Sequence, residues 1–287
     1  FFAEVGWAIR SRTFLKANLI LWHGTSFLLT QSNLCAIFAN HDVPWMSRRP
    51  ARQPRIHTQS LFTMPQTLIA DLLFPSLIAD ALCLGPHWIY DAAEISRLYS
   101  AGLTRYDSPH SKYHPGKRAG DFTHYGNQTL ALLRSIVSRG GFDAQGWRED
   151  WSRFWSQNTV SYRDGATRQT LDNLAHGLAT PSPSHDLGGA SRIAPVLAAH
   201  HGDPLDVRIK AAREQTALTH GDPIVQDAAE LFTRWVEALS TGQAMAAALD
   251  TATSAPYAAL DAASVLNTAR NYAQGSPREA ASSLGLS

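Results

Sequence analysis

The sequence predicts an all-α fold for most of the chain, and three observations support this prediction. From Met64 onward, apolar residues recur at steps of three and four, which is the spacing of one face of a helix. Residue types that start or stop helices flank these apolar stretches. Alternating runs of Val, Ile and Thr, which would indicate strands, are nearly absent from the same region.

The first two stretches with a clear apolar face lie between residues 130 and 155. The first face is formed by Leu130, Leu133, Ile136 and Val137. Gly140 and Gly141 follow it, and glycine is common just past the end of a helix. The second face is formed by Trp147, Trp151, Phe154 and Trp155. We therefore predict two consecutive helices here.

The next helices are predicted in the C-terminal half. An apolar face is formed by Ile224, Ala228, Leu231, Phe232, Trp235 and Leu239. Asp222 and Pro223 precede it, and these residue types suit the cap and the first position of a helix. Alanine-rich segments at 207–217, 243–252 and 257–273 favour further, closely packed helices. No internal repeat of fixed period is visible.

Composition excludes several classes of protein. The chain has 287 residues, of which 44% are hydrophobic and 17% are charged, and this is typical of a globular domain. Cys35 and Cys83 are the only cysteines, so neither a disulfide framework nor a zinc site of paired CxxC motifs is expected. The chemistry must come from His, Asp, Arg and backbone groups.

Residues 1–63 differ in composition from residues 64–287. They contain seven basic and two acidic side chains, whereas the remainder has a small acidic excess. We expect this segment to be a disordered leader, either an organelle transit peptide or sequence that is not native to the protein. The mildly acidic body argues against a nucleic-acid surface, and residues 17–29 are too short and too polar to span a membrane. The body is expected to be cytoplasmic, or mitochondrial or plastid if the leader is a transit peptide.

Two long loops, at 84–128 and 158–192, are predicted to carry the unusual chemistry. The first is rich in glycine and histidine and includes His87, His124 and Asn127. Lys117 and Arg118 are candidates to contact phosphate, and Thr123 and Asn127 are candidates to present oxygens at the start of the following helix. The alternative is a surface loop capped by Asn127, in which the histidines only pack or contact solvent.

The second loop has a Gly-Gly pair before a predicted short helix. Gly188 and Gly189 can expose successive N–H groups, and Arg192 follows one turn later, an arrangement that suits a diphosphate or a carboxylate. The alternative is a glycine turn in which Arg192 pairs with Asp164 or Asp186. Thr219 and His220 are interpreted as the entry to a helix.

Five segments in this order resemble the ADP-ribosylglycohydrolase family, in its J1-crystallin-like branch. They are LIADALCLGPHWIYD (77–91), HPGKRAGDFTHYGNQTLALL (114–133), YRDGATRQTL (162–171), DLGGASRIAP (186–195) and ALTHGDP (217–223). The resemblance covers residues 65–287. It implies a single multi-helix orthogonal bundle with the site at one end.

The resemblance also implies an activity and a cofactor. Active members of the family hold Mg²⁺ and cleave the glycosidic bond between ADP-ribose and a protein side chain or a small acceptor. The expected partners are therefore an ADP-ribosylated protein or an ADP-ribose-like small molecule. By the same resemblance, Thr123 is the candidate metal ligand; of the carboxylates that remain in the loops or pocket, Asp121 or Asp164 is the candidate general base.

The sequence departs from the family pattern at the metal site. The family has a Thr-Asp-Asp run where this chain reads Thr123-His124-Tyr125, and imidazole and phenol are poor ligands for Mg²⁺. Asp80, Asp121 and Asp164 are the remaining carboxylates of the loops or pocket. No Gly- and Asp-rich motif follows Asp261, so we expect the domain to be truncated at its C-terminus.

Two functions follow from this comparison with the family pattern. The first is hydrolysis of a glycosidic bond in an ADP-ribosylated or related substrate. The second is a non-catalytic role, either as a structural protein of the J1-crystallin kind or as a module that binds ADP-ribose or a nucleotide. The predicted substrate-binding residues are His87, Thr123, His124, Asn127, Gly188, Gly189 and Arg192.

Overall fold

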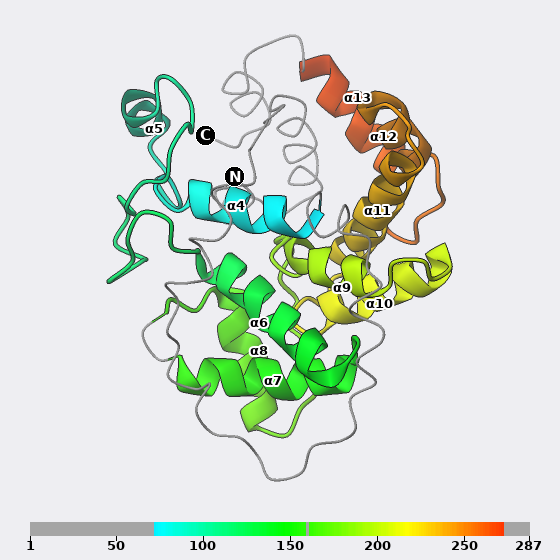
Figure 1. Cartoon of the computed structure of the whole chain (residues 1–287), viewed down its shortest axis with the longest axis horizontal. Helices are drawn as coiled ribbons and strands as arrows, with labels where there is room; N and C mark the ends of the chain where they lie inside the picture. The colour runs from blue at the N-terminus through cyan, green and yellow to red at the C-terminus, as the bar shows by residue number, and fades with distance from the viewer. Residues whose placement is uncertain (1–71, 159–160, 273–287) are drawn as a thin grey trace.

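A computed structural model describes residues 72–158 and 161–272, whose regular secondary structure consists of helices joined by loops (Figure 1). The α-helices are α4 (Phe74–Cys83), α5 (Ala92–Leu98), α6 (His124–Arg139), α7 (Ala144–Gln157), α8 (Gly165–Ala175), α9 (Ala194–Ala199), α10 (Leu205–Ala217), α11 (Pro223–Ser240), α12 (Met245–Thr253) and α13 (Ala262–Tyr272). A short 3-10 helix, η5, spans Ala190–Arg192. The described residues contain no β-strand, so the all-α prediction is confirmed.

The predicted start and stop residues act as expected in two helices. The Asp222 carboxylate accepts hydrogen bonds from the backbone N–H groups of Ile224 and Val225, at 2.8 and 3.2 Å, and so caps α11. Helix α6 ends at Gly140, whose φ of 75° lies in the left-handed region that glycine adopts without strain.

The predicted extents of the two long loops were wrong in part. Residues 92–98 form α5, residues 165–175 form α8, and α6 begins at His124, so Asn127 lies inside that helix. The N-terminal cap of α6 is Thr123 rather than Asn127, and that of α8 is Asp164. The first turns of α6 and α8 pack against other parts of the protein through polar side chains, so their apolar pattern was too weak to indicate a helix.

Two groups of buried apolar side chains hold the bundle together. In the first, Trp147, Trp151 and Trp155 of α7 pack against Leu132 and Ile136 of α6, and these five side chains are at most 2% exposed. The second group is centred on α11, which packs against α10 and α12. Burial of aromatic side chains of this size dominates the stability of a core.

Helix α6 links the parts of the fold that carry the candidate site. It packs against α4, α7 and α9, and α9 in turn packs against α10 (Figure 1). The loops on either side of α5, the loop before α8 and the loop between α8 and η5 are thereby brought around the N-terminal end of α6. These are the segments in which the sequence placed its candidate residues.

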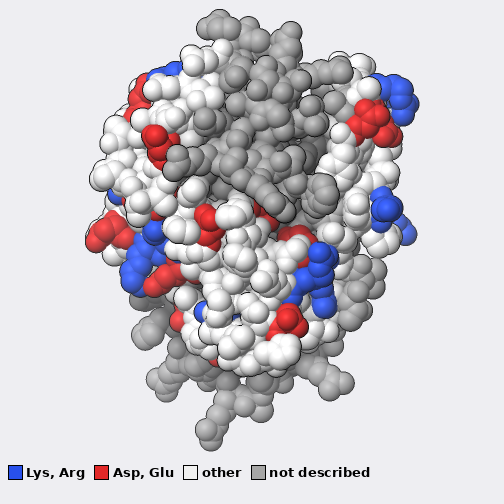
Figure 2. Space-filling model, turned by 180° about the vertical axis from the view of Figure 1, so that it is seen from behind, with Lys and Arg blue, Asp and Glu red and all other residues white. Residues whose placement is uncertain are grey.

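The charges on the described surface are mixed. On the face that Figure 2 shows, the described basic and acidic side chains lie interspersed over several elements. None of the described helices has the length and the apolar character that crossing a bilayer requires. The predicted leader, residues 1–63, lies outside the described residues. The C-terminal segment on which the predicted truncation of the domain depends, residues 273–287, also lies outside them.

Candidate functional site

The candidate site is built around the first turn of α6. Thr123 caps this helix, because its side-chain oxygen accepts a hydrogen bond from the backbone N–H of Tyr125 at 3.1 Å. Asp80 of α4 reinforces the cap: its carboxylate accepts from the Thr123 N–H at 2.8 Å, the Thr123 hydroxyl at 2.6 Å and the Gly126 N–H at 3.0 Å. A negative charge is favourable at a helix N-terminus. Asp80 therefore fixes the start of α6 against α4.

Gly126 allows this close approach of α4. A Cβ atom at this position would lie 2.1 Å from an oxygen of Asp80, so no larger residue fits while the carboxylate is in place. Burial raises the pKa of the Asp80 carboxyl, and the hydrogen bonds from Thr123 act in the opposite direction. All three donors that Asp80 contacts belong to the cap or first turn of α6. We therefore assign Asp80 a structural role, which is to hold the start of α6 against α4.

The next residue, His124, forms a buried pair with Asp164. Its Nε2 lies 2.9 Å from a carboxylate oxygen of Asp164, and the other oxygen accepts from the backbone N–H of Thr167 at 2.6 Å. The His124 side chain is 1% exposed. Burial by itself would raise the pKa of Asp164, but the hydrogen bond and charge of His124 together with the Thr167 N–H hold it below its ordinary value. Asp164 is therefore ionised at neutral pH.

The ionised state of Asp164 determines which nitrogen of His124 carries the proton. A carboxylate accepts hydrogen bonds and cannot donate them, so Nε2 must carry the hydrogen that points at Asp164. In the neutral ring, Nδ1 then holds a free lone pair. This Nδ1 is buried and has no hydrogen-bond partner among the described residues. A buried polar nitrogen left unpaired costs free energy, and such atoms are common where a protein meets a ligand or a water molecule.

Rings from three segments surround His124. Trp88 stacks on it with ring centroids 4.9 Å apart, and the centroid of the Tyr125 ring lies 3.8 Å from that of His124. Trp88 also stacks on His87 and His114 and contacts Tyr162 edge to face. The backbone of Trp88 has a φ of 63°, which is uncommon for a residue with a side chain. Such strain is held in place by surrounding packing and often occurs at functional sites.

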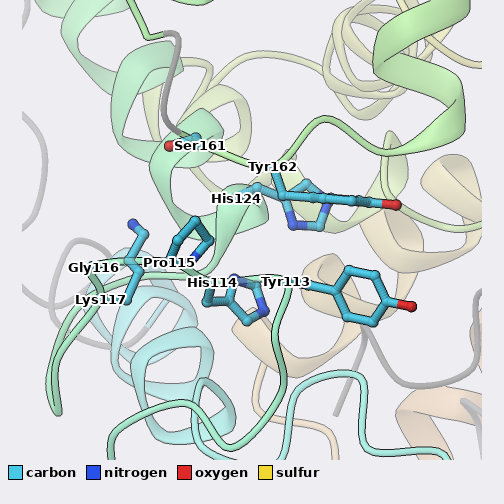
Figure 3. A pocket seen from close by; sticks show the side chains of 8 residues that line it. All are labelled: Tyr113, His114, Pro115, Gly116, Lys117, His124, Ser161 and Tyr162. Atoms are coloured by element: carbon cyan, nitrogen blue, oxygen red, sulfur yellow. The ribbon is translucent and has the colours of Figure 1, made fainter.

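A small pocket opens beside this cluster, with a volume of about 110 Å³ (Figure 3). Its lining consists of Tyr113, His114, Pro115, Gly116, Lys117, His124, Ser161 and Tyr162. The lining provides one ammonium group, two imidazoles, two phenols and a hydroxyl, and no carboxylate belongs to it. Pockets for whole small molecules are typically of about 300 Å³ or more, so this one has room for part of a ligand.

Two buried histidines of the cluster are expected to make the fold sensitive to mild acid. His87 Nδ1 and His114 Nε2 lie 2.5 Å apart. Burial, followed by the charges of His124 and Lys117, lowers the pKa of His114 to about 3, and burial also lowers that of His87. Below pH 6.5 the unfolded chain binds protons at these positions and the folded chain does not, so stability falls as the pH falls from 6.5 toward 3.

We expect the melting temperature to decrease by on the order of 5 °C between pH 7 and pH 5. The pKa values of Asp164 and Asp186 are lowered by folding, and their contribution is lost only below about pH 4, outside this window. Thermal melts of the His114→Asn variant provide the control, because removal of one of the two groups must reduce the slope. A melting temperature that is constant between pH 7 and pH 5 would contradict the burial of these rings.

Arg192 lies at the centre of a buried hydrogen-bond network behind the pocket. Its guanidinium donates to Gln215 at 3.0 Å, Gln128 at 2.7 Å and Thr219 at 2.6 Å, and the residue is 1% exposed. Burial lowers the pKa of Arg192 to about 10, and the charges of Asp164 and Asp186 act in the opposite direction. No ion pair within 4 Å joins Arg192 to either carboxylate among the described residues, so the alternative in which Arg192 pairs with Asp164 or Asp186 was wrong: its guanidinium is taken up by neutral side chains.

The Gly-Gly pair lies against side chains. A Cβ atom on Gly188 would lie 2.6 Å from the Tyr125 ring, and one on Gly189 would lie 2.7 Å from the His220 ring. His220 in turn contacts Asp186 at 2.8 Å, and Asp186 accepts from the Gly188 N–H at 2.7 Å. These glycines therefore allow the loop before η5 to pack closely onto α6 and onto the residues before α11.

The structure gathers some of the predicted site residues and separates others. His87, His124 and Asp164 belong to the cluster around the pocket, and Thr123 caps the helix that carries His124. Asp121 lies outside it, where its carboxylate accepts from the backbone N–H of Arg118 at 2.8 Å and closes a turn. The predicted roles of Gly188, Gly189, Arg192, Asn127 and the other residues in substrate binding or catalysis stay predictions.

Sequence reasoning missed the aromatic half of the cluster. Trp88 and Tyr162 contact the His124 ring, and Tyr113 contacts Trp88; these contacts join different loops and are visible only in the folded chain. One signal was present, since Trp88 follows His87, Tyr113 precedes His114 and Tyr162 lies two residues before Asp164. It did not say which of these aromatic residues meet.

The residues around Thr123 do not fit a magnesium ion. The Thr123 hydroxyl donates to Asp80, and all three hydrogen bonds that Asp80 accepts come from the start of α6. His124 and Tyr125 supply an imidazole and a phenol, whereas Mg²⁺ requires several hard oxygen ligands in octahedral geometry. Within residues 72–158 and 161–272, no three His, Cys, Asp or Glu side chains are grouped so as to hold a metal.

Comparison with protein-family models finds a match to the ADP-ribosylglycohydrolase family over residues 65–286. This match covers most of the chain, and the chain belongs to the ADP-ribosylglycohydrolase family. The family acts on ADP-ribosylated substrates and is generally metal-dependent. Comparison with curated proteins finds no match.

Proposed function

We propose that this member of the ADP-ribosylglycohydrolase family hydrolyses a glycosidic bond of an ADP-ribose-like substrate, with His124 as the proton acceptor. The observation that carries the proposal is the buried His124–Asp164 pair, whose unpaired Nδ1 belongs to a residue that lines the pocket. Family membership supports the reaction class. The position that carries an acidic residue in the family pattern carries an imidazole here, and an imidazole can perform the same proton transfer without a metal ion.

The proposed step transfers one proton and exchanges one bond. The oxygen of a water molecule forms a bond to the anomeric carbon of the ribose, while His124 Nδ1 takes a proton from that water. The glycosidic bond breaks, and its electron pair leaves with the acceptor group. The imidazolium then returns its proton to that group, so the products are the free sugar and the protonated acceptor. Asp164 stays ionised and stabilises the transient imidazolium, as the acid of a catalytic triad does.

Removal of divalent metal tests this proposal. We expect the full chain to release ADP-ribose from modified arginine, modified serine or a free O-acetyl ester, and to keep its rate within about twofold in excess EDTA. The rate is measured by chromatography of released ADP-ribose, with and without added Mg²⁺. Activity that disappears in EDTA and returns with Mg²⁺ would show a metal route and would contradict the role assigned to His124.

A second candidate function is binding of ADP-ribose without turnover. It is favoured by the hydrogen bonds that Asp80, Asp121 and Asp164 already make within the protein, since a carboxylate engaged in this way is less available to a substrate. Calorimetry with ADP-ribose distinguishes the two candidates. Heat of binding combined with no release from any of the three substrates would select the binding role. The absence of both would favour the structural role known from the J1-crystallin branch.

A further inference from the structure

We propose that Asp186 is a positioning residue for the proposed reaction, because it fixes the ring of Tyr125 against the ring of His124. The proposal rests on the proposed function, in which His124 transfers the proton. It does not require Asp186 to touch the substrate. Asp186 lies in the loop before η5, and the sequence suggested for it only a pairing with Arg192.

The Asp186 carboxylate accepts hydrogen bonds from two segments of the chain. One oxygen lies 2.8 Å from His220 Nε2 and accepts from the Gly188 N–H at 2.7 Å. The other oxygen accepts from the Ser184 hydroxyl at 2.5 Å. Burial by itself would raise the pKa of Asp186, but the charge and hydrogen bond of His220 hold it below its ordinary value. Asp186 is therefore ionised at neutral pH and acts only as an acceptor.

Gly188 carries this arrangement to Tyr125. A Cβ atom on Gly188 would lie 2.7 Å from the Asp186 carboxylate and 2.6 Å from the Tyr125 ring, so the backbone of Gly188 is packed against both. Burial, followed by the charges of Asp186 and Asp164, raises the pKa of Tyr125 well above its ordinary value, so both carboxylates are close enough to act on the phenol. The Tyr125 ring is in contact with the His124 ring. A shift of Gly188 therefore reaches His124 through one side chain.

The loop that carries Asp186 has a fixed base. Main-chain hydrogen bonds of 3.1 and 2.8 Å join Ser182 to Thr219 and to Gly221, in the segment before α11. A base must lie within hydrogen-bond reach of the proton that it takes, and a displacement of about 1 Å can cost about 10² fold in rate. A carboxylate that holds Gly188 from this base therefore has a direct effect on the reach of His124.

His185 provides a matched control. It is adjacent to Asp186 in the sequence, and its Nδ1 lies 2.6 Å from the carboxylate of Asp222, so it makes a His–Asp contact between the same two segments. The side chain of His185 is 63% exposed, whereas that of His220 is 2% exposed. The variant His185→Gln thus removes a contact between the same segments and leaves the contact between Asp186 and Gly188 in place.

Steady-state release of ADP-ribose tests the positioning role. We expect Asp186→Ala to lower kcat by about tenfold or more and to leave KM within about threefold. Asp186→Asn should restore most of the loss, because the amide oxygen still accepts from the Gly188 N–H. His185→Gln should keep kcat within about twofold. A loss confined to KM, or an Asn variant as slow as the Ala variant, would overturn the positioning role.

NMR of the full chain gives a second measurement that does not depend on turnover. The ring protons of a histidine that packs on aromatic rings resonate away from those of a free histidine, so they report the contact between His124 and Tyr125. The His124→Gln variant assigns these signals. We expect Asp186→Ala to shift them, and Gly188→Ala to shift them as well, because its added methyl group meets the Tyr125 ring. Asp186→Asn and His185→Gln should leave them in place.

The outcome for Asp186 is separable from the outcome for the proposed function. Thermal melts establish that each variant is folded. Unshifted His124 signals in folded Asp186→Ala and Gly188→Ala would overturn the positioning role, whether or not the unmodified chain turns over its substrate. Shifted signals, together with no turnover in the unmodified chain, would support the arrangement and refute hydrolysis.

Discussion

Replacement of His124 with Gln is expected to reduce turnover by about 10² to 10⁴ fold, the range that is typical for loss of a general acid–base group. Glutamine keeps a polar side chain of similar length that still reaches toward Asp164, so the fold around α6 should survive. A glutamine amide is not basic, so it cannot take up a proton as the Nδ1 of a neutral imidazole can. The loss should therefore appear in kcat, while the affinity for ADP-ribose changes little.

His110 provides a matched control for this variant. Its Nε2 lies 3.0 Å from Asp107, which reproduces the His–Asp contact of the site, but this pair is about one-third exposed and lies outside the pocket. We expect His110→Gln to keep its turnover within about twofold. Steady-state rates of ADP-ribose release and calorimetric affinities are measured for both variants. Equal rates for His124→Gln and the unmodified chain would remove His124 from the mechanism.

Asp164→Asn tests the orientation of the ring separately from its basicity. An asparagine amide can donate as well as accept, so the hydrogen on His124 is no longer required to lie on Nε2. We expect turnover to fall in this variant too, because Nδ1 then loses its free lone pair in part of the molecules. If turnover fell in Asp164→Asn only in proportion to loss of folded protein, the pair would have a structural role alone.

Sequence reasoning found the ends of helices better than the contacts of the site. The caps at Asp222 and Gly140 depend on the next few residues of the chain, and they were predicted correctly. The role of Asp80 depends on residues 43 to 46 positions away, and no local pattern reports such a contact. The start of α8 was missed for a related reason, since Thr167 and Thr170 lower its intrinsic helix propensity while burial holds them in place.

The same limit explains what was and was not known about the pocket. His124 and Asp164 were both selected as functional, but as independent residues with different roles. Their 2.9 Å contact joins segments 40 residues apart and converts two weak candidates into one chemical unit. Trp88, whose backbone φ is positive, lies beside His87 in the sequence but was not selected as a site residue. The residue types singled out both members of this pair, and only packing brought them together.

Replacement of Arg192 with Met is expected to lower the free energy of unfolding by about 3–5 kcal/mol, as when one partner of a buried charged network is removed. Methionine fills most of the volume but leaves Gln215 and Thr219 with buried polar atoms that have lost a partner. Gln128 loses one donor and keeps the indole N–H of Trp151 at 2.7 Å. Arg97→Met, on the exposed surface of α5, should change stability by less than about 0.5 kcal/mol.

Urea denaturation of the two variants, followed by circular dichroism, measures this difference, and calorimetry with ADP-ribose adds a second criterion. A residue that only binds substrate would leave stability near that of the unmodified chain and would lower affinity. A residue that organises the fold lowers stability first, because Arg192 joins η5 to α6, α10 and the segment before α11. The loop before η5 packs on Tyr125 of α6, so Arg192 supports the site indirectly. We therefore expect Arg192→Met to weaken ligand binding only as a consequence of its lost stability. Weaker binding with undiminished stability would reassign Arg192 to the substrate.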